Sequence, residues 1–409
     1  MTTCLTSAKV YLGLAGNPPP FTLGTSGTSL LGGTHVLTGS GTANGRFVWT
    51  EVSQHVESVV SVSKGGGSDS LHFRAGPGRC SFTLSNLDGQ YDPLNTGGPH
   101  YGKLRAGLPI KVTATPDGGA ETIMFIGRAD DWPVEYWNDQ WSEVRISASD
   151  DVETLNSANP GKLDLDIPVQ TTTDRCKEIL NRGGWPDALV SVESHAWMNW
   201  EQQRTDLGQT TWAELQLAAD SGDAWLYLDP DNVIRVVKNT IPTTPVATFG
   251  NASTPAAIIP LVDLEADRNP RARLVNRLTV RTPYVEPPSV WTFDDVLSQS
   301  QDGERAWERS DLMTWPALGL YFYGDVLAQR WNDVPQWQPS KLTVRPETAT
   351  HATTCIAAKV GTLVEVKQVT PDARTITARG YVCGTRWLFP PVGRPTVELS
   401  LYPERRPTA

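Results

Sequence analysis

"GRCSFTLSNLDGQYDPLNTGGPHYGKLRAG", residues 78–107, holds a strand-like segment followed by a polar turn and a long loop. Cys80, Phe82 and Leu84 alternate with small polar or basic residues. A period of two is typical of a β-strand that buries one face. We therefore expect "CSFTLSN" (80–86) to be a half-buried strand of a β-rich domain.

The turn that follows this strand carries Asn86, Asp88 and Asp92, which resemble part of a calcium-binding loop. The third acidic position and the distal glutamate of such a loop are missing. Asn, Asp and Gly also suit tight turns, because their side chains bond nearby backbone or tolerate positive φ. We interpret the segment as a corner of the chain and not as a metal site.

Alternating segments continue to residue 150: "PIKVTAT" (109–115), "ETIMFIGRADDWPVEYW" (121–137, bent near Asp130–Pro133) and "EVRISAS" (143–149). Short strands at this spacing, separated by turn signals, indicate a sandwich or a barrel. From residue 150 the period changes to that of helices, with capping boxes at Asp150/Glu153 and Thr211/Glu214 and glycine stops at Gly183 and Gly222. β-type sequence returns after residue 260.

These changes in pattern predict a mainly β protein with α+β insertions, in which two β-rich halves flank an α+β middle. The expected parts are an N-terminal strand and loop arm (1–45), a first β domain (46–150), an α+β domain (151–259), the start of a second β domain (260–290), a mixed insertion (291–340), and the remainder of the second β domain with a tail (341–409).

Composition and charge exclude several classes of function. The net charge of −10 argues against a general grip on nucleic-acid phosphates, which requires a basic surface. The five cysteines form no C-x-x-C pair, so a disulfide framework or a zinc site is not expected. No signal peptide and no membrane-spanning run are recognisable. We expect synthesis and folding in a reducing cytoplasm.

The sequence contains no constellation that indicates catalysis. The six histidines are dispersed without H-E-x-x-H spacing, and G-x-S-x-G, Walker A and G-x-G-x-x-G motifs are missing. The acidic pairs at 130–131 and 294–295 do not suggest a shared cleft, because neighbours on a strand point to opposite faces. We predict no catalytic, cofactor-binding or metal-binding residues and no enzymatic activity.

Tryptophan is frequent, with 15 residues, and Trp132, Trp137 and Trp141 lie within ten positions. Packing in cores and turns explains many tryptophans. The same residue type is enriched among the anchors of protein interfaces, and it can also stack on sugars. We predict that the Trp132–Trp141 segment contributes to contacts between chains or domains.

Several segments in order resemble phage minor tail proteins of the tail-hub (baseplate hub) family. They are "NLDGQYDPLN", "YGKLRAGLPIKV", "FIGRADDWPVEYW", "VRISASDD", "WAELQLAADSGDAWLYLDPDNVIRVV", "RNPRARLVNRLTV" and "GYVCGTRWLFPPVGRPTVELSLYP". The resemblance covers residues 46–405 and leaves the first 45 residues uncovered. No lysozyme, peptidase or fibre segment is recognisable within the chain.

The resemblance implies an architecture and a function. Such proteins are similar to the central hub of contractile tails and of type VI secretion spikes, with two small β-barrels per chain and α+β insertions. Three copies would form a ring at the virion tail tip. The ring would join a six-fold tail tube and its distal tail protein to a three-fold tip, contact the tape-measure protein and receptor-binding proteins, and let DNA pass without specific binding. A distal tail protein forming a hexameric ring, or an adhesin for cell-wall sugars, are the alternatives.

Overall fold

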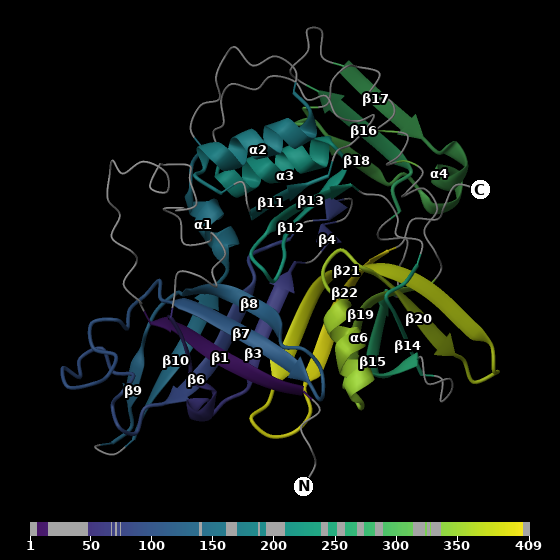
Figure 1. Ribbon diagram of the computed structural model, residues 1–409. Helices are drawn as coiled ribbons and strands as arrows, with labels where there is room; N and C mark the ends of the chain where they lie inside the picture. The colour runs from purple at the N-terminus through teal and green to yellow at the C-terminus, as the bar shows by residue number, and fades with distance from the viewer. Residues whose placement is uncertain are drawn as a thin grey trace.

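The computed structural model describes most of the chain outside several loops and the two ends. The described residues are 6–14, 48–66, 68–69, 72–73, 75–138, 141–160, 170–186, 189–193, 209–238, 244–251, 258–267, 274–282, 289–313, 324, 328 and 337–403. The protein is mainly β with α+β insertions, as the sequence predicted. Figure 1 shows two β-barrels side by side, with the α+β part and a small sheet above them.

The first barrel, called barrel 1 here, is formed by strands from the N-terminal third of the chain. These are β1 (Thr6–Leu14), β2 (Val48–Glu51), β3 (Val60–Gly65), β6 (Arg79–Ser85), β7 (Pro109–Pro116), β8 (Thr122–Ala129), β9 (Val134–Tyr136) and β10 (Ser142–Ser149). The expected alternation holds in β6, where Cys80, Phe82 and Leu84 are buried.

One bent segment closes barrel 1. It consists of β2, the short 3-10 helix η1 (Ser53–His55) and β3. The start of this segment pairs with β1, and its end pairs with β6. The remaining neighbours follow as β1–β7, β7–β8, β8–β10 and β10–β6, so the hydrogen-bonded order returns to the bent segment. Closure leaves few strand edges exposed to unwanted pairing.

The second barrel, barrel 2, is formed by strands from the C-terminal part of the chain. These are β14 (Ala247–Gly250), β15 (Ile258–Asp267), β19 (Gln338–Val344), β20 (Leu363–Val369), β21 (Thr375–Phe389) and β22 (Thr396–Pro403). They follow one another around the barrel as β15–β19–β22–β21–β20–β14, and β14 pairs with β15 to complete the ring. Helix α6 (Ala349–Ala357) connects β19 to β20.

The two barrels share the same strand order, both along the chain and around the ring. β1, the bent β2–β3 segment, β6, β7, β8 and β10 correspond to β14, β15, β19, β20, β21 and β22. Every neighbouring pair in one ring has its counterpart in the other. The first strand is the one difference in direction, since β1 is antiparallel to both neighbours and β14 is parallel to both. Each barrel also carries an insertion after its second strand, which is the bent β2–β3 segment in barrel 1 and β15 in barrel 2.

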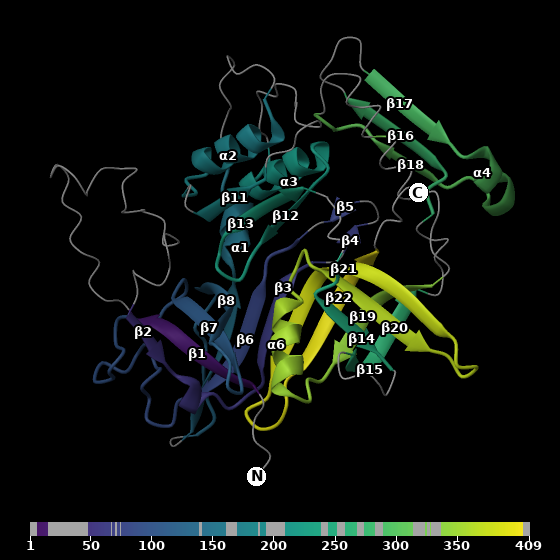
Figure 2. The ribbon, with the colours of Figure 1, turned by 45° about the vertical axis from the view of Figure 1, so that its right-hand side comes forward.

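Among the described residues, one antiparallel ladder joins the barrels. β3 of barrel 1 pairs with the second half of β21, from Val60↔Phe389 to Gly65↔Gly384. At this joint Trp387 lies opposite Val62, both side chains are buried, and the Trp387 ring stacks on Phe389 at 5.4 Å. The side chains inside both barrels belong to one hydrophobic cluster. Figures 1 and 2 agree that the barrels lie next to each other along this seam.

The α+β part lies between the barrels in sequence and above them in space (Figure 2). It contains α1 (Asp151–Ser157), α2 (Thr172–Arg182), α3 (Thr211–Ser221) and a sheet ordered β11 (Val190–Val192), β13 (Ile234–Lys238), β12 (Ala224–Leu228). Asp150 caps α1, and Gly183 and Gly222 end α2 and α3, as predicted. The cap of α3 is Thr210 and not Thr211. Thr211 Oγ1 instead donates to the Ala158 carbonyl.

A second insertion lies between β15 and β19. It contains β16 (Arg277–Thr282), β17 (Ser289–Asp294), α4 (Val296–Asp302) and β18 (Ala306–Arg309), in the order β17–β16–β18. Arg309 Nη1 donates to Asp220 Oδ2 of α3 at 2.7 Å, which attaches this sheet to the α+β part. A two-stranded ribbon, β4 (Ser68–Asp69) with β5 (His72–Phe73), occupies the matching position after β3.

Strand pairing corrects three of the expected parts. Residues Thr6–Leu14 are not an arm, because β1 lies between β2 and β7 in barrel 1. Residues Ala247–Gly250 belong to barrel 2 and not to the α+β domain, because β14 pairs with β15 and β20. β1 pairs with β7, and β14 with β20, far away in sequence, where local patterns carry no information. Residues Arg277–Thr282 lie in the second insertion and not at the start of barrel 2, because β16 pairs with β17 and β18. The other expected boundaries stay predictions.

Candidate functional site

The loop that follows β6 is a corner built by side-chain hydrogen bonds to backbone. Asn86 is buried; its Oδ1 accepts from the Tyr91 N–H at 2.7 Å and its Nδ2 donates to Ser142 Oγ at 3.0 Å. Asp88 Oδ1 accepts from the Gln90 N–H, and Asp92 Oδ1 from the Leu94 N–H. These carboxylates therefore form Asx turns within the loop, which supports the interpretation of the segment as a turn.

Chelation of divalent cations by EDTA is expected to leave the melting temperature and the assembly state unchanged. Asp88 and Asp92 each accept from a backbone N–H two residues ahead, and Asp92 also accepts from Tyr136 Oη. Within the described residues no group of three or more His, Cys, Asp or Glu could hold a metal ion. Differential scanning calorimetry with and without EDTA measures this, and a shift of several degrees would contradict the turn interpretation.

The three clustered tryptophans occupy different environments. Trp132 is buried in barrel 1, where its Nε1 donates to the Tyr91 carbonyl at 2.9 Å and so holds the loop after β6. Trp137 and Trp141 are 60% and 45% exposed. Trp132 precedes β9, whereas Trp137 and Trp141 lie at the end of the hairpin that β9 forms with β10. The prediction of an interface thus concerns Trp137 and Trp141, and Trp132 has a structural role inside the barrel.

The exposed tryptophans lie on the hairpin formed by β9 and β10. The Trp137 N–H donates to the Trp141 carbonyl at 3.0 Å, and the neighbouring Tyr136 is also 60% exposed. Tyr136 Oη donates to Asp92 Oδ2 at 2.6 Å, and this hydrogen bond raises the pKa of the phenol. Leu87 and Leu94 of the nearby loop are exposed as well. We call Tyr136, Trp137 and Trp141 the aromatic end of barrel 1.

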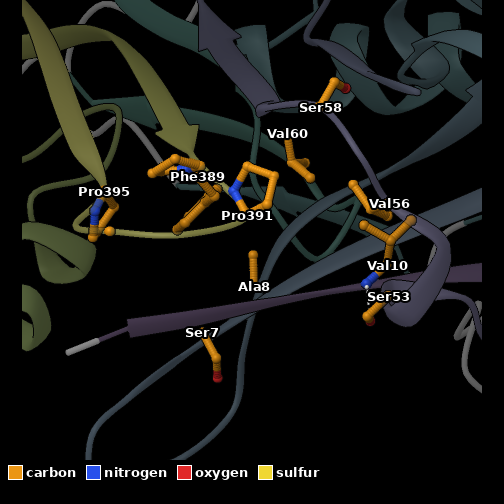
Figure 3. Close-up of a pocket in the computed structure, with 12 residues that line it drawn as sticks. Ser7, Ala8, Val10, Ser53, Val56, Ser58, Val60, Phe389, Pro391 and Pro395 are labelled. Atoms are coloured by element: carbon orange, nitrogen blue, oxygen red, sulfur yellow. Dashed lines mark hydrogen bonds between the residues drawn. The ribbon is translucent and has the colours of Figure 1, made fainter. Parts of the chain in front are cut away.

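A cavity of about 280 Å³ lies at the joint between the barrels. Figure 3 shows Phe389 and Pro391 from barrel 2 lying opposite Val56, Val60 and Ala8 of barrel 1. Two of the hydroxyls on its wall, those of Ser53 and Ser58, accept hydrogen bonds from backbone N–H groups. Ser53 Oγ accepts from the Val10 N–H at 3.0 Å, and Ser58 Oγ from the Thr83 N–H at 2.7 Å. We interpret this cavity as a packing gap.

A second cavity, of about 420 Å³, lies between the barrels, α6 and the β12–β13 hairpin. Its wall is mainly apolar, and the two best-buried charged residues on it, Lys64 and Asp229, are both paired. Lys64 Nζ donates to Asp150 Oδ2 at 2.9 Å, and Asp229 Oδ2 accepts from Arg235 Nε at 2.8 Å. These charges are engaged in the fold, so this cavity does not suggest a reaction.

The cysteines of the described chain also do not suggest a nucleophile. Cys80, Cys176, Cys355 and Cys383 are buried, and they form no disulfide with one another. Burial raises the pKa of the Cys355 thiol to about 12 and raises that of Cys80 further. A reactive cysteine needs the opposite shift, because the thiolate is the nucleophile. Among the described residues no helix is long and apolar enough to cross a membrane.

Comparison with solved structures finds two proteins that match over nearly their whole length. One is a tail protein from Neisseria meningitidis MC58, with a TM-score of 0.60, 15% identity, and coverage of 97% of this chain and 96% of that chain. The other is the 43 kDa tail protein of prophage MuSo2 from Shewanella oneidensis, with a TM-score of 0.58, 14% identity, and coverage of 97% and 98%. The chain has the fold of these tail proteins. The resemblance seen in the sequence is confirmed at this level.

No protein-family model matches the chain, and no curated protein matches it either. The tail-protein fold is thus recognisable here through its architecture more than through residue identity. The resemblance implied two similar β-barrels in each chain, and the strand order adds that the barrels correspond strand for strand. In the sequence, a signal for this correspondence lies in the insertions, because both barrels are interrupted after the second strand of the ring.

Proposed function

We propose that this chain is a structural protein of a phage-type tail tip. In this proposal three copies form a hub ring that joins a six-fold tail tube, through the ring of the distal tail protein, to three-fold tip proteins. The hub would also contact the end of the tape-measure protein and hold receptor-binding proteins. It has no enzymatic role in this proposal, and it acts in the virion tail tip after synthesis in the host cytoplasm.

The observation that carries the proposal is the repeated barrel. Two barrels of the same strand order lie edge to edge in one chain, joined by the β3–β21 ladder. A three-fold ring of such chains presents six similar barrels, which is what a junction between six-fold and three-fold structures requires. A chain with one barrel would need six copies to do the same. The tail-protein fold of the two structural neighbours supports this assignment.

The charge of the chain suits a conduit for DNA. The net charge is −10, and a surface of this sign repels a polyanion that moves past it. We propose that DNA passes through the ring without specific binding, and that acidic side chains outnumber basic ones on the channel wall.

The assembly state tests the proposal. We expect purified protein to have a native mass three times that of the 44.7 kDa chain. The same measurement distinguishes the distal tail protein, the second candidate, which would give a hexamer. A hexamer or a monomer in native mass spectrometry at assembly concentrations contradicts the hub assignment.

The exposed Trp137 and Trp141 also fit a surface that stacks on sugars. We rank this adhesin role below the hub, because neither of the two cavities described above has Trp137 or Trp141 in its wall. Binding of the protein to host cell-wall glycans on an array, lost in Trp137→Ala, would favour the adhesin.

A further inference from the structure

Barrel 2 has an open strand edge on β15. Residues 258–260 of this strand pair with β14, and the rest of the strand pairs with β19 only. The second edge of residues 261–267 has no strand partner among the described residues. The Leu264 N–H is bonded at 2.9 Å by the carboxylate of the adjacent Asp263, and not by a strand. Val262 on this segment is 57% exposed.

Barrel 1 has an open strand edge on β9. In the part of the chain that the structure describes, β9 pairs with β10 alone. Because the Trp137 N–H bonds to Trp141, the alternation of an antiparallel ladder directs the peptide groups of Glu135 toward β10. The peptide groups of Val134 and Tyr136 are therefore directed to the open edge. Natural proteins normally protect such edges, since an open edge is a template for pairing with another chain.

These two edges are the counterparts of the two edges that already pair within the chain. β15 corresponds to the bent β2–β3 segment. In both, the first part pairs with the first strand of its barrel. The second part pairs with the next strand of the barrel along one edge, which leaves its other edge available outside the barrel. In the bent segment that edge, on β3, is occupied by β21.

The bent run from β8 into β9 corresponds to the long strand β21. In both, the first half pairs with the preceding strand, and the second half pairs with the following one, β10 or β22. The outer edge of the second half of β21 is occupied by β3. The outer edge of β9 is open. The joint inside the chain therefore pairs the outer edge of β3 with the outer edge of β21. The corresponding edges, on β15 and on β9, have no strand partner among the described residues.

The open edges of β9 and β15 also lie on the sides of the two barrels that are opposite the internal joint. Around barrel 2, β15 is three neighbours away from β21 in either direction, so it lies on the side opposite the internal joint. Around barrel 1, β8 is likewise three neighbours away from β3. Figure 1 shows β9 on the side of barrel 1 that faces away from barrel 2. One molecule thus presents complementary edges at its two ends.

The side chains at the open edges match those of the internal joint. On β21, Trp387 and Phe389 lie in the ladder with β3 and are only 2% and 4% exposed. On and beside β9, Tyr136 and Trp137 are both 60% exposed. Val262 supplies an exposed aliphatic group on β15, as Val60 and Val62 supply buried ones on β3. Covering the aromatic end would remove a large apolar area from water.

We infer that β15 of one copy pairs in antiparallel fashion with β9 of the next copy, repeating the β3–β21 joint between chains. The inference rests on the proposed hub function and assigns the contact that would close its ring. The contact is heterologous, so copies follow one another head to tail, and a ring forms if the rotation closes. The aromatic end of barrel 1 would then be covered by the edge of barrel 2 from the neighbouring copy.

Disulfide trapping tests this contact in the full chain. Glu135→Cys, Tyr136→Cys or Trp137→Cys is combined in turn with Val262→Cys or Asp263→Cys, in a Cys4→Ser background. The four other cysteines are buried. Directly opposite residues on paired strands lie about 4.5–5.5 Å apart, within the range of a disulfide. We expect at least one pair to give covalent dimers and trimers on non-reducing gels, and the control pair of Tyr136→Cys with Val392→Cys to give none.

A proline variant tests the backbone pairing separately. Tyr136→Pro removes an N–H directed to the open edge and leaves the Glu135 and Trp137 bonds to β10 in place. We expect it to prevent trimer formation without changing the melting temperature of the monomer, whereas Tyr136→Ala retains more assembly. A trimeric mass without any specific cross-link, or Tyr136→Pro trimers as stable as wild type, overturns this contact and leaves the hub function standing. A mass other than that of a trimer refutes the hub function itself.

Discussion

Replacing Asp150 by alanine is expected to lower the free energy of unfolding by about 3–5 kcal/mol. Asp150 Oδ2 accepts from Lys64 Nζ at 2.9 Å, and the side chains of the two residues are only 1% and 5% exposed. Removing the carboxylate would leave the Lys64 charge buried without its partner. The variant would also lose the cap of α1, where Asp150 Oδ1 accepts from the Val152 N–H. Urea unfolding followed by circular dichroism measures the loss.

Two matched variants separate the charge from the cap. Asp150→Asn keeps an acceptor for the Val152 N–H and removes the charge, so it should still destabilise the fold strongly. Adding Lys64→Met to Asp150→Asn removes the unpaired cation and should recover part of the loss, because a buried pair can be replaced by neutral groups at small cost. A loss below about 1 kcal/mol for Asp150→Ala, the size of a cap alone, would contradict this account.

Replacing Trp387 by alanine is expected to cost about 3–5 kcal/mol, the usual range for a large aromatic residue in a core. Its ring is 2% exposed, stacks on Phe389, and lies opposite Val62 across the ladder between the barrels. The substitution would open a cavity at the only strand ladder that joins the barrels among the described residues. Thermal and urea unfolding of the purified variant measure the effect.

Trp137→Ala is the control for this substitution. Its ring is 60% exposed, so its removal should change the stability of the monomer by no more than about 0.5 kcal/mol. Similar losses for Trp387→Ala and Trp137→Ala would mean that the joint does not stabilise the chain in the way its burial indicates.

The sequence by itself determined the local elements. The alternation of Cys80, Phe82 and Leu84 predicted β6, because a strand places every second side chain on the same face. The Asp150 box and the glycine after α2 predicted helix ends, because caps act on backbone groups a few residues away. The mainly β character, the α+β middle and the order of segments that resembles tail hubs all follow from such short-range patterns.

The tertiary structure alone decided which strands meet and which aromatic residues stay exposed. β1 pairs with β7, and β3 with β21 at the opposite end of the chain; no periodicity encodes such partners, because pairing depends on contacts that are distant in sequence. Trp132 and Trp137 are near neighbours with the same side chain, yet Trp132 lies inside the barrel and Trp137 is 60% exposed. The open edges of β9 and β15 likewise exist only once both barrels have closed. Until the other strands have paired, it is not determined which strand edges lack a partner.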